Sequence, residues 1–272
     1  MKYTHLAATH VDQYLLFIKI IRKKENTMFK IIALVKRKSG MSLQEFIDYY
    51  ESTHAKLGEK YYSTCAERYA RRYLHLMAPV TEPQSGGAES EFDVVTELWF
   101  TDRQIFEKVM AEHPEALVEI AEDEENFQER SKTQMFTVEE HDSECGDRSL
   151  PYFKVLAMVK RKSGMSLQEF INYYESKHAK LGEEFFGTNA ARYARRYLHP
   201  MIPDIEPQTG IIEATFDVLT ELWFKDSESF EKALAEHPDS ATRIAKDEEN
   251  FQDRSKTQMF ILEEYESKVG PS

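Results

Sequence analysis

The sequence predicts an α+β protein in which two ferredoxin-like βαββαβ units pack sheet against sheet. Three observations support this prediction. The chain repeats itself at a constant offset of 124 residues, which relates Lys30 to Lys154 and Trp99 to Trp223. Each copy shows strand and helix patterns in the order β-α-β-β-α-β. A short polar linker separates the two copies.

The repeat is the duplication of a whole domain. The stretch FKIIALVKRKSGMSLQEFIDYYESTHAKLGE from Phe29 returns as FKVLAMVKRKSGMSLQEFINYYESKHAKLGE from Phe153, and about two thirds of all aligned positions are identical. Solenoid repeats have periods of about 20–50 residues. A period of 124 residues matches the size of a small domain instead.

The first part of each copy predicts a strand, a helix and a second strand. Residues 29–36 are apolar and β-branched, which is typical of a buried strand. Ser42 and Glu45 form a capping box, and apolar residues at helical spacing extend the helix to about residue 54 or 58. Residues 68–76 alternate between polar and apolar and predict the second strand.

The second part of each copy predicts a strand, a broken helix and a last strand. A loop rich in Pro, Gly and Ser at 81–91 precedes the alternating strand at 92–100. The helix that follows breaks near His113 and Pro114, because proline removes a backbone donor. Residues 132–139 predict the fourth strand.

This element order places both helices on one face of an antiparallel sheet. The other face of the sheet must be covered, and a second copy of the same unit can cover it. Because the second copy lies in the same chain, we predict an intramolecular pseudo-dimer whose two sheets close a barrel. The alternative is that each copy pairs with another molecule, as in a homodimer.

The repeat also sets the predicted boundaries. They are an N-terminal extension at 1–27, a first domain at 28–140, a linker at 141–151, a second domain at 152–264 and a tail at 265–272. The extension is basic, whereas the rest of the chain is acidic. It is either an amphipathic helix that docks on the body or a surface, or a non-native leader before a natural start at Met28. We favour the second interpretation.

The composition excludes several classes of partner. A formal net charge of −13 argues against nucleic acids and anionic membranes, which attract Lys and Arg. No apolar run reaches the length of a membrane span. Cys65 and Cys145 occupy non-equivalent positions, so we expect no disulfide framework and a reducing, cytoplasmic location. The acidic run at 119–129 is interpreted as a solvated helix face anchored by Phe127.

Four motifs, each present in both copies, resemble the EthD family. They are H-A-K-L from His54, Y-L-H ending at His75, F-D-V-x-T-E-L-W-F from Phe92, and D-E-E-N-F with S-K-T-Q-M-F from Asp123. The resemblance covers nearly all of 29–140 and 153–264. It implies a dimeric α+β barrel with a small-molecule pocket inside, and no metal or organic cofactor. Relatives in fungal polyketide pathways resemble decarboxylases or dehydratases, and other members accompany an oxygenase in ether degradation.

Strand alternation sorts the candidate pocket residues. In residues 92–100, one face should pack under the helices and carries Phe92, Val94, Thr96, Leu98 and Phe100; the other carries Asp93, Val95, Glu97 and Trp99. One face of residues 68–76 carries Tyr69, Arg71, Tyr73 and His75. If that face also looks into the barrel, the pocket combines aromatic walls with an imidazole, a guanidinium and acids. The equivalents in the second copy are Tyr193, Arg195, Tyr197, His199, Asp217, Glu221 and Trp223. The alternative is a salt-bridged sheet surface with aromatic filler.

His75 and His199 are the first candidates for acid/base catalysis, because imidazole can take and give a proton near neutral pH. On the same strand faces, Tyr73 and Tyr197, or Arg71, could donate to a developing enolate. The structural alternative is a pair of interface histidines at strand ends.

Two further pairs of histidines repeat. His54 and His178 end the first helix, where the helix dipole explains them without catalysis; the EthD resemblance makes them catalytic candidates as well. His113 and His237 precede prolines and are interpreted as structural. The sequence has no metal-ligand spacing and no phosphate-binding glycine loop, so no cofactor is predicted.

The leading hypothesis is a cofactor-independent small-molecule enzyme of the EthD type. It would act by proton transfer on an aromatic or polyketide-like acid, by decarboxylation, dehydration or cyclisation. The first alternative is a non-catalytic binding or auxiliary protein that serves an oxygenase. The second is a cofactor-free monooxygenase.

Overall fold

The computed structural model describes residues 28–77, 89–144, 152–187, 189–201, 213–236 and 238–270. The predicted extension at 1–27 and Cys145 lie outside these residues. The first half contains β1 (Phe29–Val35), α2 (Leu43–Tyr49), η1 (Tyr50–His54), α3 (Ala55–Tyr62), β2 (Arg68–Leu76), β3 (Val94–Phe100), α4 (Arg103–Glu112), α5 (Pro114–Phe127), η2 (Arg130–Lys132) and β4 (Gln134–Glu144). The second half contains β5 (Phe153–Val159), α6 (Leu167–Tyr173), η3 (Tyr174–His178), α7 (Ala179–Phe186), β6 (Ala190–Pro200), β7 (Val218–Phe224), α8 (Ser227–Glu236), α9 (Pro238–Glu248), η4 (Arg254–Lys256) and β8 (Gln258–Ser267).

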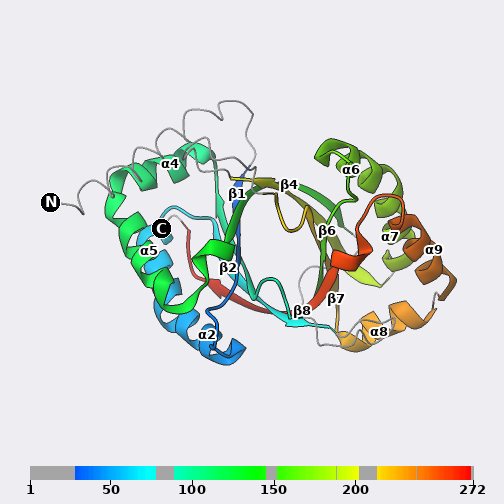
Figure 1. Cartoon of the computed structure of the whole chain (residues 1–272), viewed down its shortest axis with the longest axis horizontal. Helices are drawn as coiled ribbons and strands as arrows, with labels where there is room; N and C mark the ends of the chain where they lie inside the picture. The colour runs from blue at the N-terminus through cyan, green and yellow to red at the C-terminus, as the bar shows by residue number, and fades with distance from the viewer. Residues whose placement is uncertain are drawn as a thin grey trace.

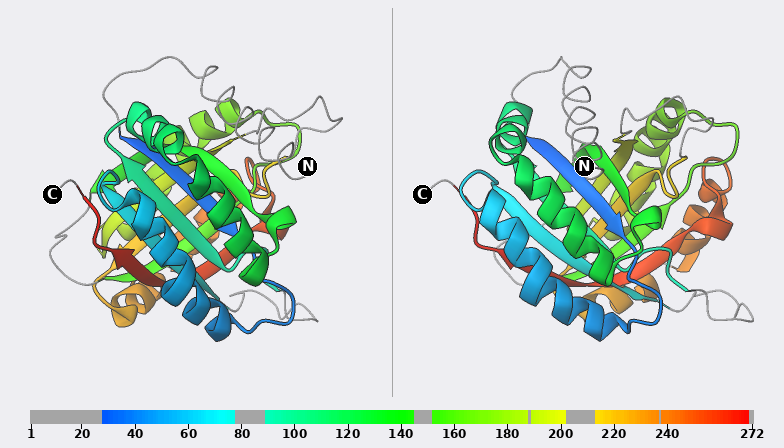
Figure 2. Two further views of the ribbon diagram at one scale, coloured as in Figure 1. Left: turned by 90° about the vertical axis from the view of Figure 1, so that its left-hand side faces the viewer. Right: turned by 60° about the vertical axis from the view of Figure 1, so that its left-hand side comes forward.

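The strands form a closed antiparallel barrel in the order β1-β3-β2-β8-β5-β7-β6-β4, with four strands from each half. The helices lie outside the barrel on two opposite sides, one set from each half (Figures 1 and 2). The predicted α+β class is therefore confirmed. None of the helices in the described part of the chain is long and apolar enough to span a bilayer.

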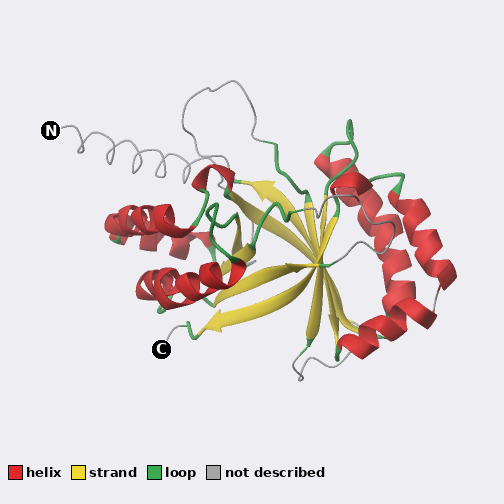
Figure 3. Ribbon diagram, turned by 60° about the horizontal axis from the view of Figure 1, so that its bottom comes forward, coloured by secondary structure: helices red, strands yellow, loops and turns green. Residues whose placement is uncertain are grey.

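Strands β4 and β8 connect the halves. β4 pairs first with β1 and then with β6, in a register that places Glu139 opposite Tyr197. β8 pairs in the same way with β5 and β2 and places Tyr265 opposite Arg71. Both strands use backbone partners on the other half, so strand structure continues through residues 141–144 of the predicted linker and 265–267 of the predicted tail. Figure 3 shows the strands lying between the two sets of helices.

The helices follow the sequence signals, with one difference. The Ser42–Glu45 capping box is present, and the predicted break occurs at His113, with Pro114 as the first residue of α5. The first helix, however, continues beyond the predicted end to Tyr62, through the π-helical turn η1. Turns of this type occur frequently at functional sites. The second half repeats the turn as η3.

The barrel interior is filled by side chains from both halves. An apolar cluster occupies much of it and includes Ile32, Leu34, Leu74, Val95, Phe136, Leu156, Met158, Leu198, Leu219 and Phe260. Phe92 also belongs to this cluster and not to the face under the helices, because β3 begins only at Val94. This corrects the predicted position of Phe92.

Candidate functional site

A part-buried histidine–aspartate pair lies at the π-helical turn of the first half. Nδ1 of His54 lies 2.8 Å from Oδ2 of Asp123 on α5. The Tyr49 hydroxyl donates to the other carboxylate oxygen at 2.7 Å. The His54 ring packs against Phe127 and Tyr50, with centroids 4.7 and 4.8 Å away. Nε2 of His54 has no hydrogen-bond partner among the described residues, so it is the nitrogen that could exchange a proton with a ligand.

The second half builds the same pair with the same geometry. Nδ1 of His178 lies 2.9 Å from Oδ2 of Asp247, and the Tyr173 hydroxyl donates to Oδ1 at 2.7 Å. The His178 ring packs on Phe251 at 4.7 Å. The orientation of the imidazole by a carboxylate at Nδ1 fixes its tautomer, as in the histidine–carboxylate pairs of hydrolytic triads.

Burial favours the neutral form of both imidazoles. The side chain of His54 is 12% exposed and that of His178 is 10% exposed. Desolvation lowers the pKa of each histidine below its usual value, although the neighbouring Asp123 or Asp247 partly opposes the shift. A neutral imidazole at neutral pH can act as a general base.

A second group of polar residues lies near this pair, under the same helix. We name Glu51, Arg71 and Tyr73 the Glu51 cluster. Arg71 donates from Nε and Nη2 to the two oxygens of Glu51 at 2.9 and 2.5 Å. The Tyr73 hydroxyl donates to Oε1 of Glu51 at 2.7 Å. Tyr50 separates this cluster from His54, because its ring lies 4.8 Å from the His54 ring and 6.0 Å from the Tyr73 ring.

The equivalent Glu175 cluster consists of Glu175, Arg195 and Tyr197. Arg195 donates to both oxygens of Glu175 at 3.0 and 2.9 Å, and the Tyr197 hydroxyl donates to Oε1 at 2.6 Å. Burial, together with the adjacent Glu51 or Glu175, raises the pKa of Tyr73 and Tyr197. Both phenols therefore remain protonated hydrogen-bond donors at neutral pH.

Each cluster is completed by a strand of the other half. In the first half, Arg71 donates to Ser267 of β8 at 2.7 Å, and Tyr265 packs edge-on against Tyr73. In the second half, Arg195 donates to Ser143 of β4 at 2.8 Å. Position 141, which is equivalent to 265, carries a histidine, so the completed clusters differ in one residue.

The histidines that were the first catalytic candidates lie at the exposed edge of these clusters. Nε2 of His75 lies 2.9 Å from Glu263 of β8, and His75 is 43% exposed. Nε2 of His199 lies 3.6 Å from Glu139 of β4, and His199 is 42% exposed. Oε1 of Glu139 also lies 2.8 Å from Nε2 of His141, which is a shorter contact than the one to His199.

The structure separates the predicted pocket residues into two groups. Tyr69 and Tyr73 pack with Phe46 and Tyr50 under the helices, so the face of β2 that carries Tyr69, Arg71, Tyr73 and His75 is the outer face of the barrel. Tyr193 and Tyr197 lie in the equivalent cluster of the second half, on the face that also carries Arg195 and His199. The hypothesis that these residues look into the barrel is wrong, because aromatic residues of the first helix cover this face.

Glu97 and Glu221 do lie inside the barrel, but they contact arginines. Both carboxylates are 1% exposed or less, and both contact Arg72 and Arg196, which are equally buried. Nε of Arg72 also donates to Glu264, and Nε of Arg196 donates to Glu140, each at 2.7 Å. These residues therefore form an internal ion network.

The remaining predicted residues also make protein contacts. The indole nitrogens of Trp99 and Trp223 donate to Glu97 and Glu221 on their own strands. Lys30 lies over the Trp99 ring, and Lys154 lies over the Trp223 ring. Asp93 and Asp217 are buried, and their carboxylates accept from the backbone and guanidinium of Arg37 and Arg161.

Sequence reasoning missed several members of these groups. Asp123 was placed on a solvated face, although its recurrence as Asp247 within D-E-E-N-F was a usable signal. Glu51 recurs as Glu175 in the motif Y-E-S-x-H, directly before the histidine. Arg72 recurs as Arg196 in R-Y-A-R-R-Y-L-H, but this recurrence does not reveal its contacts with Glu221 and Glu264, which come from the other half of the chain.

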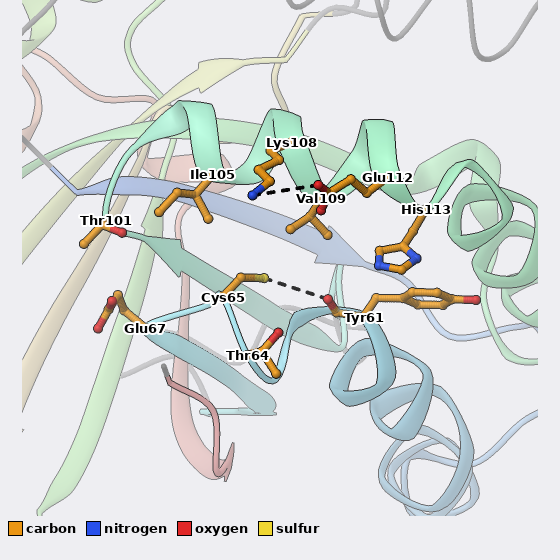
Figure 4. Close-up of a pocket in the computed structure, with 10 residues that line it drawn as sticks. All are labelled: Tyr61, Thr64, Cys65, Glu67, Thr101, Ile105, Lys108, Val109, Glu112 and His113. Atoms are coloured by element: carbon orange, nitrogen blue, oxygen red, sulfur yellow. Dashed lines mark hydrogen bonds and ion pairs between the residues drawn. The ribbon is translucent and has the colours of Figure 1, made fainter. Parts of the chain in front are cut away.

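A separate pocket of about 340 Å³ lies in the first half, between the end of α3 and helix α4. Figure 4 shows its lining: Tyr61, Thr64, Cys65, Glu67, Thr101, Ile105, Lys108, Val109, Glu112 and His113. None of the predicted site residues lines this pocket.

In the described part of the chain, no group of three or more His, Cys, Asp or Glu side chains has the arrangement of a metal site.

Several solved structures align with most of this chain. An anthrone oxidase-like protein aligns with a TM-score of 0.52 and 8% identity over 92% of this chain and 98% of its own. A candidate monooxygenase of Lactobacillus acidophilus NCFM aligns with a TM-score of 0.47 and 8% identity over 90% and 97% of the two chains. A mutant chlorite dismutase of Candidatus Nitrospira defluvii aligns with a TM-score of 0.44 and 8% identity over 88% and 93%. No curated protein matches the sequence.

The sequence also matches a family model twice. The model, described as the EthD domain, matches residues 38–131 and 162–255, which together make up more than half of the chain. Both matched segments include the π-helical turn with its histidine and the aspartate that contacts it. The chain therefore belongs to the EthD family and carries two EthD domains in tandem.

Proposed function

We propose that this protein is a cofactor-independent small-molecule enzyme that acts by proton transfer on an aromatic or polyketide-like acid. Decarboxylation, dehydration and cyclisation all fit this chemistry. The observation that carries the proposal is the part-buried histidine–aspartate pair, which both halves build at the same π-helical turn. A neutral imidazole held by a carboxylate at Nδ1 can remove a proton through Nε2 and return it later.

The neighbouring cluster supplies the second requirement of such a reaction. When a carbon next to a carbonyl loses a proton or carbon dioxide, its electron pair moves to the carbonyl oxygen. A protonated donor stabilises the resulting enolate. Tyr73 and Arg71 in the first half, and Tyr197 and Arg195 in the second, are the donors of this proposal, and they would exchange their bonds to Glu51 and Glu175 for bonds to the enolate. His75 and His199 are the exposed groups that would exchange the proton with water.

The test compares two double variants with the wild type on a panel of phenolic and β-keto acids. In His54→Gln/His178→Gln, the side-chain amide of each glutamine can still donate to the aspartate. This double variant therefore removes the base with little disturbance of the fold. His75→Ala/His199→Ala removes the exposed histidines. We expect the first variant to keep ligand affinity and lose turnover, and the second to be slower. Unchanged turnover in the first variant would contradict the assignment of His54 and His178.

A second candidate function is favoured by the pocket between α3 and α4. A pocket of about 340 Å³ that contains none of the catalytic candidates suits a binding or auxiliary protein of a degradation pathway. Ligand binding without turnover of any panel compound by the wild type would support this function. The panel should include an anthrone, and an oxygen electrode should follow the reaction. Oxygen uptake would identify the third candidate, a cofactor-free monooxygenase.

We also propose that the barrel is an intramolecular pseudo-dimer and that the protein works in the reducing cytoplasm. The pseudo-dimer is supported by the exchange of β4 and β8 between the halves, which gives each cluster a serine from the other half. Light scattering on the purified chain tests it. A mass of one chain is expected, and an obligate dimer would contradict it.

A further inference from the structure

The pocket between α3 and α4, which we name the α3–α4 pocket, is built from the first half alone. Its residues lie on the end of α3, the segment between α3 and β2, the turn after β3, and α4 with the residue that follows it (Figure 4). The histidine–aspartate pair and the Glu51 cluster contribute no residue to its lining. Any ligand of this pocket would therefore occupy a site separate from the proposed catalytic groups.

Six of the ten residues that line the pocket have uncharged side chains. Tyr61, Ile105 and Val109 supply aromatic and aliphatic surface, and Thr64 supplies a hydroxyl group. The Cys65 thiol donates to the carbonyl oxygen of Tyr62, which lies 3.5 Å from the sulfur. Burial raises the pKa of Cys65, so the thiol remains protonated and uncharged at neutral pH.

The two basic side chains of the lining, Lys108 and His113, already face carboxylates. Nζ of Lys108 lies 3.8 Å from Glu112, and Nδ1 of His113 lies 3.0 Å from Glu115. An anionic ligand would have to compete with these carboxylates and would also approach the exposed Glu67. The charge distribution therefore favours a neutral ligand with polar groups.

Comparison of the halves shows that the fold does not require this lining. Six of its ten positions differ in the second half: Tyr61/Phe185, Cys65/Asn189, Glu67/Ala191, Thr101/Lys225, Ile105/Ser229 and Val109/Ala233. Over the whole repeat only about a third of the positions differ. The second half forms the equivalent helices and strands with the other residues. The first half therefore has pocket chemistry that the second half lacks.

We propose that the α3–α4 pocket binds one neutral molecule of one or two aromatic rings that carries a hydroxyl group. A closed apolar cavity of about 150 Å³ holds benzene, so a pocket of about 340 Å³ has room for two fused rings. Tyr61, Ile105 and Val109 would contact the rings. The threonine hydroxyl and the thiol would face the hydroxyl group of the ligand.

The test uses the full chain with 2-naphthol as the probe and 2-naphthoate as its anionic analogue. We expect calorimetry to give one equivalent of 2-naphthol per chain and at least about tenfold weaker binding of 2-naphthoate. Bound 2-naphthol should also slow the alkylation of Cys65, which peptide mass spectrometry distinguishes from that of Cys145. Two equivalents per chain, or equal affinity for both probes, would overturn the proposal.

A matched pair of variants locates the binding site. Ile105→Trp places an indole in the pocket and should weaken 2-naphthol binding at least about tenfold, whereas Ser229→Trp at the equivalent position should leave it unchanged. If Ile105→Trp does not fold, Cys65→Asn, which introduces the second-half residue, replaces it with the same expectation. Retention of full affinity in the folded variant would overturn the assignment. His54→Gln/His178→Gln should bind 2-naphthol normally, so this result is independent of the proposed enzymatic function.

Discussion

His141 of β4 packs edge-on against Tyr197 of β6, with ring centroids 5.6 Å apart, at the place where Tyr265 of β8 packs against Tyr73 in the first half. Nδ1 of His141 also lies 3.5 Å from Glu175. The two clusters thus share their central glutamate, arginine and tyrosine but differ in the residue that the other half supplies. Only the second cluster brings an imidazole next to its glutamate.

This difference predicts that the two halves have separable activities. His54→Gln should remove the contribution of the first half and His178→Gln that of the second, so each single variant should retain part of the turnover. The activities left by the two single variants should differ, because only the second-half cluster has an imidazole, that of His141, beside its glutamate. Turnover of the single and double variants across pH 5–9 checks this. Complete loss in one single variant would mean that one half does all of the chemistry.

The internal ion network predicts a large effect on stability. Glu97→Ala should lower the free energy of unfolding by up to about 3–5 kcal/mol, because it takes away one buried carboxylate that contacts both Arg72 and Arg196 and leaves both arginines buried. Denaturant unfolding measures the effect. The control is Glu236→Gln at the exposed contact with Lys232, which should change stability by less than about 1 kcal/mol. Equal effects of the two variants would mean that the network does not stabilise the barrel.

The same carboxylate predicts acid sensitivity. Burial alone would raise the pKa of Glu97, but Arg196 and Arg72 hold it at about 2. Because this pKa lies below the unfolded value of 4.5, the unfolded chain binds more protons as the pH falls. The contribution of Glu97 to stability is present above pH 4.5 and is lost as the pH falls towards 2. Unfolding curves of the wild type and Glu97→Gln should therefore converge in this range, and parallel curves would contradict the assignment.

The repeat made the fold predictable, and strand alternation placed Val95 and Glu97 correctly inside the barrel. Alternation separates the two faces of a strand but does not say which face the helices cover. The outer face of β2 carries Arg71 and looks polar, yet Phe46 and Tyr50 cover its tyrosines. The charge of Arg71 is matched by Glu51, which is distant along the sequence.

The candidate site could be predicted only where its members are near in sequence or recur as a motif. His54 was identified from its motif, but the Asp123 contact depends on how α5 packs against the π-helical turn. The role of residues 141 and 265 depends on strand exchange between the halves. In the sequence, these residues lie in segments that resemble a linker and a tail. Their position beside the clusters becomes evident only from the pairing of the barrel strands.

The histidine–aspartate pairs predict a second pH effect, at milder acidity. Burial lowers the pKa of His54 and His178 below the unfolded value of 6.5. Below pH 6.5 the unfolded chain therefore takes up protons that the folded chain does not, and stability falls. Each histidine can contribute a slope of at most about 1.4 kcal/mol per pH unit. His54→Gln/His178→Gln should lose less stability than the wild type between pH 7.5 and 5.5, as measured by denaturant unfolding; an equal loss would show that these histidines protonate freely in the folded protein.

Close packing of α3 on β2 predicts a steric effect at Gly58. A Cβ atom at this position would lie 2.6 Å from Cε1 and 2.7 Å from the hydroxyl oxygen of Tyr69, which is only 3% exposed. Gly58→Ala should therefore displace the ring and lower the free energy of unfolding by about 1–3 kcal/mol. Gly182→Ala should behave alike, since its Cβ atom would lie 2.7 Å from Cε1 of Tyr193.

The hydroxyl contact offers an internal control for this effect. Tyr69→Phe removes one of the clashing atoms, so Gly58→Ala should be less destabilising in the Tyr69→Phe background than in the wild type. A double-mutant cycle by denaturant unfolding measures the coupling. Additive effects would mean that the helix moves away from the sheet as a unit and that the tyrosine hydroxyl does not limit how closely α3 approaches β2.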